Sequence, residues 1–237
     1  MSKYKFLIFD VDDTLLNFYS AYESAQLNCA QKLGIPYSKE FAELYEKSGW
    51  KAWKEGGLDN TESPKIQNNY HTLYYQYLHN HYKYLLQELA LCFDKNILVN
   101  CYIDSIASSK VFMEPDTLQT YIALSSHYQL VLATNGIEKI QNKRLENLIP
   151  FTYKTYISEA IGYIKPSNKF YEYMIRDLDC SPNDCLMVGD SITNDILGAK
   201  TAGIDVCFYN IQNKKKPTAI IVDYEIDSIK NLLQILL

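Results

Sequence analysis

The chain has 237 residues, of which 47% are apolar and 22% are charged, and this balance argues against a disordered or fibrous protein. The length suits either one core with an inserted module or two tandem domains. The formal net charge of -5 argues against binding to polyanions, so we expect neither a nucleic-acid polymer nor a membrane surface as the partner.

The first predicted element is an apolar strand over residues 4–9, preceded by no leader-like segment. The six cysteines form no CxxC pair, which indicates free thiols in a reducing compartment. No apolar run approaches the length of a membrane span. We therefore expect a cytoplasmic protein, with the oligomeric state left open between a monomer and a homodimer.

The stretch from residue 17 to residue 110 is almost entirely helix-like. Breaks at Gly34–Pro36, Gly56–Gly57, Ser63–Pro64 and Cys92–Lys95 divide it into four or five helices. We expect this stretch to be a helical cap inserted into a discontinuous core. The predicted domains are a core of residues 1–16 and 111–237, and a cap of residues 17–110.

Beyond the cap, apolar strands alternate with segments of helical spacing. The predicted strands span residues 129–133, 153–157, 185–188, 206–209 and 219–222, and the predicted helices span 139–148, 167–178, 195–202 and 226–236. Strands alternating with helices are typical of an α/β fold with a Rossmann-like, doubly wound parallel sheet covered on both faces. The basic run of residues 214–216 is interpreted as a solvated loop.

Asp10 and Asp12 follow the first strand. In extended chain, residues two apart point the same way, so both carboxylates would meet at the carboxyl edge of the sheet, where parallel sheets bind ligands. Two crowded carboxylates repel, and a hard divalent cation with oxygen ligands relieves the repulsion. The competing interpretation is a strand-end turn with solvated aspartates, and this pair of residues alone does not favour a cation site over such a turn. A calcium-binding EF-hand loop fits this stretch poorly, because Leu15 occupies the place where such a loop requires glycine.

Three further motifs each follow an apolar strand or precede a predicted helix. Thr134, Asn135 and Gly136 follow the strand at 129–133, and their hydroxyl, amide and main-chain N–H groups suit phosphate oxygens, although Asn-Gly is more often only a turn. Lys165 precedes a proline and a predicted helix; it suits charge neutralisation, although most lysines are solvated surface residues. Asp190 follows a strand and a glycine, and it suits a magnesium shell. Asp195 also suits an ordinary helix N-terminus.

Together, these motifs resemble the four motifs of the haloacid dehalogenase-like (HAD) hydrolase superfamily, which read DxDxT, a hydrophobic residue with threonine, K-P, and GDxxxxD. The resemblance covers essentially the whole predicted core. It implies that Asp10 attacks phosphorus to form an aspartyl-phosphate, and that Asp12 protonates the leaving group and then activates water. The presence of Asp12 favours phosphoryl chemistry over attack on carbon.

The resemblance also implies the remaining site. Mg²⁺ is expected on Asp10, the main-chain carbonyl of Asp12, and Asp190. Lys165 is expected to neutralise charge, and Thr134, Asn135 and Gly136 to bind the phosphate. Thr14, Ser191 and Asp195 are expected to orient these groups without contacting the substrate directly.

The inserted helices resemble a C1-type cap, which suits small phosphorylated metabolites as substrates. Thr134–Gly136, Gln141 and Arg144–Leu145 resemble the signature of YjjG-type pyrimidine nucleotidases and of N-acylneuraminate-9-phosphatases. We therefore expect a 5'-nucleotidase acting on pyrimidine nucleoside monophosphates. The alternatives are a phosphatase of N-acylneuraminate 9-phosphate, phosphoglycolate or a sugar phosphate, a phosphomutase, or an inactive binding scaffold. The scaffold predicts a missing catalytic residue, and none is missing.

Cap residues carry weaker expectations. Phe18, which closely follows the first motif, is a candidate substrate contact. Three other aromatic residues of the cap are candidates as well, namely Tyr19, Trp50 and Trp53, although packing is the more common role of such side chains. His79 and His81 are two residues apart and so face different ways on a helix, which argues against a metal pair. The tyrosines between residues 70 and 84 are expected to pack within the cap with solvated hydroxyls.

Overall fold

The computed structural model describes residues 3–211, 213 and 220–237. The described chain divides into two compact units. Of the described residues, the sheet unit comprises those within 1–17, 112–138 and 145–237, and the helical unit comprises residues 18–111 and 139–144. Residues 139–144 were predicted to belong to the core, and they lie in the helical unit instead. The predicted loop at residues 214–216 lies outside the described residues.

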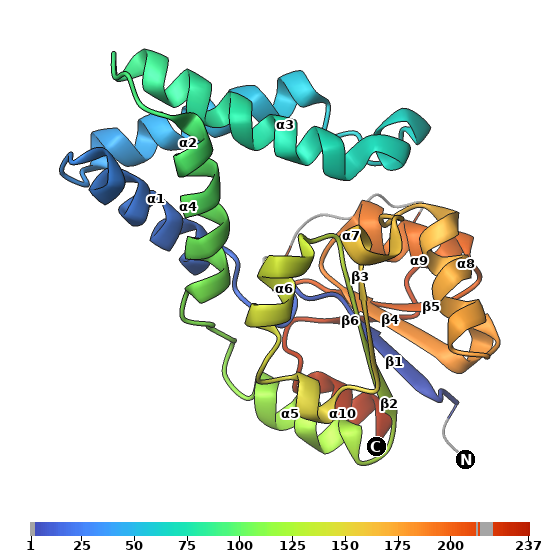
Figure 1. Cartoon of the computed structure of the whole chain (residues 1–237). Helices are drawn as coiled ribbons and strands as arrows, with labels where there is room; N and C mark the ends of the chain where they lie inside the picture. Colours follow the sequence, from blue (N-terminus) through green and yellow to red (C-terminus); the bar gives the residue numbers. More distant parts are fainter. Residues whose placement is uncertain (1–2, 212, 214–219) are drawn as a thin grey trace. The chain divides into compact units, whose positions relative to one another are not determined.

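The sheet unit is built on six parallel strands in the order β3-β2-β1-β4-β5-β6, which confirms the predicted α/β fold class (Figure 1). The strands are β1 (Phe6–Phe9), β2 (Gln129–Thr134), β3 (Lys154–Ile157), β4 (Cys185–Gly189), β5 (Asp205–Tyr209) and β6 (Tyr224–Ile226). The central strands are buried along their whole length, as expected for a parallel sheet covered on both faces. Chain order reverses across β1, so the carboxyl ends of β1, β2 and β4 form the usual ligand-binding edge.

Helices cover both faces of this sheet, with α8 and α9 on one face and α5 and α10 on the other (Figure 1). Their bounds are α5 (Thr117–Ser125), α7 (Ser158–Ile161), α8 (Asn168–Asp177), α9 (Gly198–Thr201) and α10 (Asn231–Leu236). Three short turns complete the unit, namely η1 (Ile149–Phe151), η2 (Pro182–Asp184) and the π-helical η3 (Ile192–Leu197).

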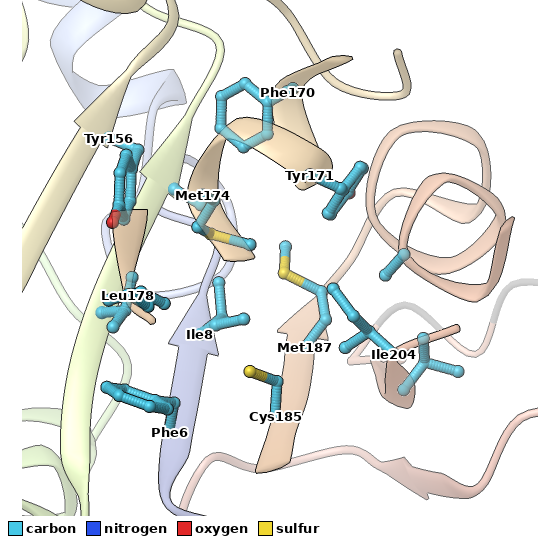
Figure 2. Close-up of a cluster of buried hydrophobic side chains, with 14 of the residues drawn as sticks. Phe6, Ile8, Tyr156, Phe170, Tyr171, Met174, Leu178, Cys185, Met187 and Ile204 are labelled. Carbon is cyan, nitrogen blue, oxygen red and sulfur yellow. The ribbon is translucent and has the colours of Figure 1, made fainter. Parts of the chain in front are cut away.

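Apolar side chains of β1 and β4 pack against α8 to form one core of the sheet unit (Figure 2). Phe6 and Ile8 of β1 lie beside Met187 of β4, and Phe170 and Met174 of α8 cover them. Because alternate residues of a strand face opposite sides, Phe9 contacts the other layer, where its ring lies 5.3 Å from that of Tyr121 on α5. Packing on both faces fixes the position of the loop that follows β1.

Two predictions for the C-terminal region are wrong. Residues 220–222 form no strand, and the edge strand is instead Tyr224–Ile226, which pairs with Cys207–Tyr209 of β5. The predicted helix over 226–236 is too long, because Ile226 closes β6 and α10 begins only at Asn231. The apolar residues 219–222 have the composition of a strand, but strand formation at this edge depends on pairing with β5, and β5 pairs with Tyr224–Ile226 instead.

The helical unit contains α1 (Tyr19–Leu33), α2 (Lys39–Gly56), α3 (Pro64–Glu88) and α4 (Lys95–Ser108), together with most of α6 (Glu138–Arg144). Its helices end where the sequence predicts breaks. Gly34 and Gly57 close α1 and α2 in the left-handed conformation, at φ 71° and 66°, which a residue without Cβ adopts at low cost. Among the described helices, none is both long and apolar enough to cross a membrane.

A buried cluster of Tyr45, Tyr77, His81 and Tyr82 fills the interior of the helical unit. The Tyr45 and Tyr82 hydroxyls lie 2.7 Å apart, and His81 Nε2 lies 3.0 Å from the Tyr45 carbonyl oxygen. The His81 ring stacks on Tyr77 and Tyr82. Packing within the cap was expected of these tyrosines, but the expected solvation of the Tyr82 hydroxyl is wrong, because its side chain is fully buried.

Candidate active site

A pocket of about 160 Å³ opens at the carboxyl edge of the sheet unit. The four predicted motifs all contribute to its lining, which comprises Asp10, Asp12, Thr134, Asn135, Lys165, Asp190, Ser191, Asn194 and Asp195. Asp10, Asn135 and Asp190 each follow the last residue of a parallel strand, and Thr134 is itself the last residue of β2. The sheet therefore brings together residues that are far apart in the sequence.

Lys165 is the centre of the pocket's hydrogen-bond network. Its Nζ donates to Asp10 Oδ1 at 2.6 Å, to Asp195 Oδ1 at 2.7 Å and to the Ala133 carbonyl oxygen at 2.8 Å. The side chain is almost completely buried. Burial alone would lower the pKa of Lys165, but the carboxylates of Asp10 and Asp195 outweigh it and raise the pKa above its ordinary value. Lys165 is therefore a fixed positive charge.

Asp10 is held in a balance of opposing effects. The pKa of Asp10 is raised to about 7. Burial is the largest cause, the Lys165 ammonium opposes the rise, and the carboxylates of Asp195 and Asp12 add to it. An anionic Asp10 at neutral pH therefore depends on Lys165 and on any further cation that the pocket binds. This is the environment of a reactive carboxylate rather than of a solvated turn residue.

Asn135 holds the main chain of Lys165. Its side-chain Nδ2 donates to the Lys165 carbonyl oxygen at 2.7 Å, and its Oδ1 accepts from the Lys165 N–H at 2.8 Å. The Asn135 amide thus fixes the segment that carries Lys165, which sequence reasoning had not foreseen. Gly136, also predicted to bind substrate, is not among the pocket-lining residues that the structure describes, and its carbonyl oxygen accepts from the Ser158 hydroxyl.

Asp195 lies in the π-helical turn η3 and is fully buried. Its Oδ1 accepts from Lys165, and its Oδ2 accepts from the Ser191 N–H at 3.0 Å. Burial raises the pKa of Asp195, and Lys165 opposes the rise. A Cβ at Gly189 would overlap the Asp195 carboxylate, so only glycine leaves room for this arrangement.

Thr14 and Ser191, predicted to support the site, each make a hydrogen bond beside the pocket, and their part in the reaction stays a prediction. The Thr14 hydroxyl accepts from the Asp190 N–H at 3.1 Å and so joins the loop after β1 to the end of β4. The Ser191 hydroxyl accepts from the Asn194 N–H at the start of η3. Phe18, in contrast, lies in the helical unit just before α1, and its part in substrate binding stays a prediction.

Three carboxylates meet the geometric requirements of a cation site. One oxygen from each of Asp10, Asp190 and Asp195 lies within 4.8 Å of the other two. Oxygen ligands of this kind suit Mg²⁺. Both oxygens of Asp195 already accept hydrogen bonds, so Asp10 and Asp190 are the better ligands and Asp195 is better placed to orient Lys165.

Comparison with known proteins gives a consistent result. Residues 4–203 match the family model of the haloacid dehalogenase-like hydrolases. The pyrimidine 5'-nucleotidase PynA of Streptococcus pneumoniae is 31% identical over 98% of this chain and 95% of its own length. The pyrimidine 5'-nucleotidase YjjG of Escherichia coli is 24% identical over 99% of this chain and 98% of its own.

The putative HAD-hydrolase YfnB of Bacillus subtilis is 29% identical, with the alignment covering 100% of this chain and 97% of YfnB. Its crystal structure, bound to magnesium and described as revealing interdomain movement, superposes with a TM-score of 0.82. That superposition covers 99% of both chains at 26% sequence identity.

Proposed function

Because the chain belongs to the haloacid dehalogenase-like hydrolase family, we propose that it hydrolyses phosphomonoesters with Mg²⁺ through an aspartyl-phosphate on Asp10. The observation that carries this proposal is the contact of 2.6 Å between Lys165 Nζ and Asp10 Oδ1 in a pocket of carboxylates. A fixed ammonium beside a carboxylate keeps the nucleophile anionic, and it offsets the negative charge of an arriving phosphoryl group.

The proposed reaction has two displacement steps at phosphorus. An Asp10 oxygen forms a bond to phosphorus while the ester P–O bond breaks, and Asp12 gives its proton to the leaving alkoxide. Asp12 then takes a proton from water, whose oxygen attacks the phosphoryl group and releases Asp10 and inorganic phosphate. Lys165 and Asn135 line the same pocket, and the Asn135 amide holds the Lys165 main chain through two hydrogen bonds.

A magnesium ion fits the donors of the proposed site. Asp10, Asp190 and the main-chain carbonyl of Asp12 would hold it, and when bound it would neutralise charge on the phosphoryl oxygens. The carboxylate spacing and the magnesium-bound structure of YfnB support this assignment. Asp195, Ser191 and Thr14 would orient these groups through the hydrogen bonds described above.

For the substrate, we propose a pyrimidine nucleoside monophosphate. Two full-length relatives, PynA and YjjG, are pyrimidine 5'-nucleotidases, and the Thr134–Gly136 and Arg144–Leu145 signature points the same way. We also propose that the helical unit acts as a cap that selects small phosphorylated metabolites, with Phe18 among its contacts.

The test is a hydrolysis panel that contains pyrimidine and purine nucleoside monophosphates, sugar phosphates, phosphoglycolate and N-acylneuraminate 9-phosphate. We expect Mg²⁺-dependent release of phosphate and alcohol in equal amounts, fastest with a pyrimidine nucleotide. Transfer of the phosphoryl group to a second hydroxyl without phosphate release would indicate a mutase instead. A folded wild-type protein that releases phosphate from none of these compounds contradicts the proposal.

The matched variants are Asp10→Asn and Asp13→Asn, in the same loop. Asp10→Asn removes the nucleophile and should lower the rate at least about a thousandfold, with no radiolabelled phosphate trapped on the protein. Asp13 is exposed, lies outside the pocket lining and has φ 64°, a conformation that asparagine adopts readily, so Asp13→Asn should keep wild-type kinetics.

A further inference from the structure

The short helix α6 is anchored inside the helical unit at both of its ends. Lys139 Nζ lies 2.7 Å from Asp104 Oδ1 on α4, and the Arg144 guanidinium carbon lies 5.4 Å from the ring centroid of Phe18, at the start of α1. Residues 139–144 accordingly belong to the helical unit, although β2, which precedes them, belongs to the sheet unit.

Of these two anchors, Arg144 is the unusual one. Lys139 and Asp104 are mostly exposed, and such pairs contribute little. Arg144 is only 1% exposed and is the largest of the fully buried side chains among the described residues. Burying a guanidinium is costly, and a leucine would fill a helix face at lower cost. An arginine at this position therefore calls for an explanation beyond packing.

The chain connection supplies that explanation. Only Ile137 and Glu138 separate Gly136 from the part of α6 that lies in the helical unit. The Glu138 N–H donates to Glu159 Oε2 at 2.7 Å within the sheet unit, so the link has little slack. On its other side, this segment continues into Asn135, whose amide holds the Lys165 main chain. A shift of α6 therefore reaches Asn135 and Lys165 over a few bonds.

We propose that Arg144 is a positioning residue for the reaction. By holding α6 on the Phe18 ring, it fixes Thr134–Gly136 and, through Asn135, the main chain of Lys165. The inference rests on the proposed function for its kinetic consequence, but not for its structural one. It also gives the Gln141 and Arg144–Leu145 signature a physical meaning, since all three side chains lie on the buried face of this segment.

The kinetic test compares Arg144→Met and Arg144→Lys with the control Asn142→Ala, an exposed position on the same helix. Methionine keeps the length of the side chain without its charge, and lysine keeps the charge without the planar face that stacks on an aromatic ring. We expect kcat to fall at least about tenfold in Arg144→Met and less in Arg144→Lys, with KM changed less than kcat. Asn142→Ala should match the wild type.

The structural test is hydrogen exchange of the peptide that spans residues 134–138, which does not require activity. Exchange should be at least about fivefold faster in Arg144→Met than in the wild type, and unchanged in Asn142→Ala. If the wild type releases no phosphate from any substrate, the proposed function fails and this measurement alone decides the inference. Wild-type exchange in a folded Arg144→Met protein overturns the inference, and so does wild-type kcat in an active enzyme.

Phe18→Leu provides a second route if Arg144→Met does not fold. It removes the ring beneath the guanidinium, so exchange across residues 134–138 should rise as it does in Arg144→Lys. Combined with Arg144→Lys, it should add little, because both changes break one contact. Full additivity of the two effects would show that Arg144 does not act through Phe18, and would overturn the inference.

Discussion

The sheet unit and the helical unit each bury a cluster of ionisable side chains, but the two clusters differ in charge. In the sheet unit, Lys165 lies between Asp10 and Asp195, and its raised pKa keeps the ammonium charged. In the helical unit, burial raises the pKa of Tyr45 and Tyr82 well above the ordinary value and lowers that of His81 to about 4. The second cluster is therefore neutral at physiological pH.

The difference in charge indicates that the first cluster serves a functional site and that the second belongs to a packed interior. Burying opposite charges together costs more than burying apolar groups of the same shape, so a stable fold alone does not require the first cluster. Neutral hydroxyls and an imidazole that bond to each other cost little once their partners are present. We therefore expect changes in the first cluster to affect both activity and stability, and changes in the second to affect stability alone.

The largest effect is expected for Lys165→Met. The variant leaves Asp10 and Asp195 buried without their shared cation, which should cost about 3–5 kcal/mol of unfolding free energy. Phosphate release should fall at least about a thousandfold, because charge neutralisation at the phosphoryl group is lost. Urea unfolding and the hydrolysis assay measure the two effects. A Lys165→Met variant with the stability of the wild type would contradict the expected cost of leaving the two carboxylates without their cation.

The next effect concerns Asp190→Asn, which weakens the proposed magnesium site without removing the nucleophile. Loss of one carboxylate ligand should raise the Mg²⁺ concentration for half-maximal activity at least about tenfold. Titration of activity with Mg²⁺ measures this, and Asp13→Asn serves as the control. An unchanged magnesium requirement would mean that the ion binds elsewhere or is not needed.

A pH effect should distinguish the neutral cluster. In the folded protein His81 stays unprotonated down to a pKa of about 4, whereas in the unfolded chain it takes up a proton below the ordinary pKa of 6.5. The unfolding free energy should therefore fall as the pH drops from 6.5 to 4, by about 3 kcal/mol from this residue. In His81→Gln, that part of the pH dependence should vanish. Urea titrations at pH 7 and pH 4 give the unfolding free energy of both proteins. An equal change in unfolding free energy between the two pH values in the wild type and in His81→Gln would contradict the prediction.

The smallest effect is expected for Tyr45→Phe and Tyr82→Phe. Each leaves one buried hydroxyl without its partner and should cost about 1–2 kcal/mol. The double variant should cost little more than either single variant, since no hydroxyl is then stranded. Kinetic constants should stay within about twofold of the wild type. A large loss of kcat would show that the second cluster also serves the reaction.

The sequence predicted the pocket edge well because its residues stand where apolar strands end. The position of Asp10 and Asp190 follows directly from the strands before them, and Thr134 itself ends its strand. Parallel strands place their carboxyl ends along one edge whatever the details of packing. Lys165 follows no strand directly, and its place was indicated by the proline after it, by the predicted helix that follows, and by the K-P motif of the resemblance.

Other features depend on tertiary structure and leave little trace in the sequence. The π-helical turn that buries Asp195 has no recognisable residue pattern, and the edge strand Tyr224–Ile226 is selected by its neighbour β5. The membership of residues 139–144 in the helical unit follows from contacts made by Lys139 and Arg144 with distant helices. The sequence offered the Gln141 and Arg144–Leu145 signature as a signal, but not the burial of Arg144.

The three hydrogen bonds of Lys165 also set a condition on substrate entry. An ammonium group has three protons, and here they go to Asp10, Asp195 and the Ala133 carbonyl oxygen. On the proposed function, a phosphate group that enters the pocket would be attracted by the charge of Lys165, and it would gain a direct hydrogen bond only by displacing one of these three acceptors. Exchange at Asp10 would release a carboxylate oxygen at the moment when phosphorus comes within reach. The resting network would thus exchange one ammonium hydrogen bond for another when substrate binds, without changing the charge of Lys165.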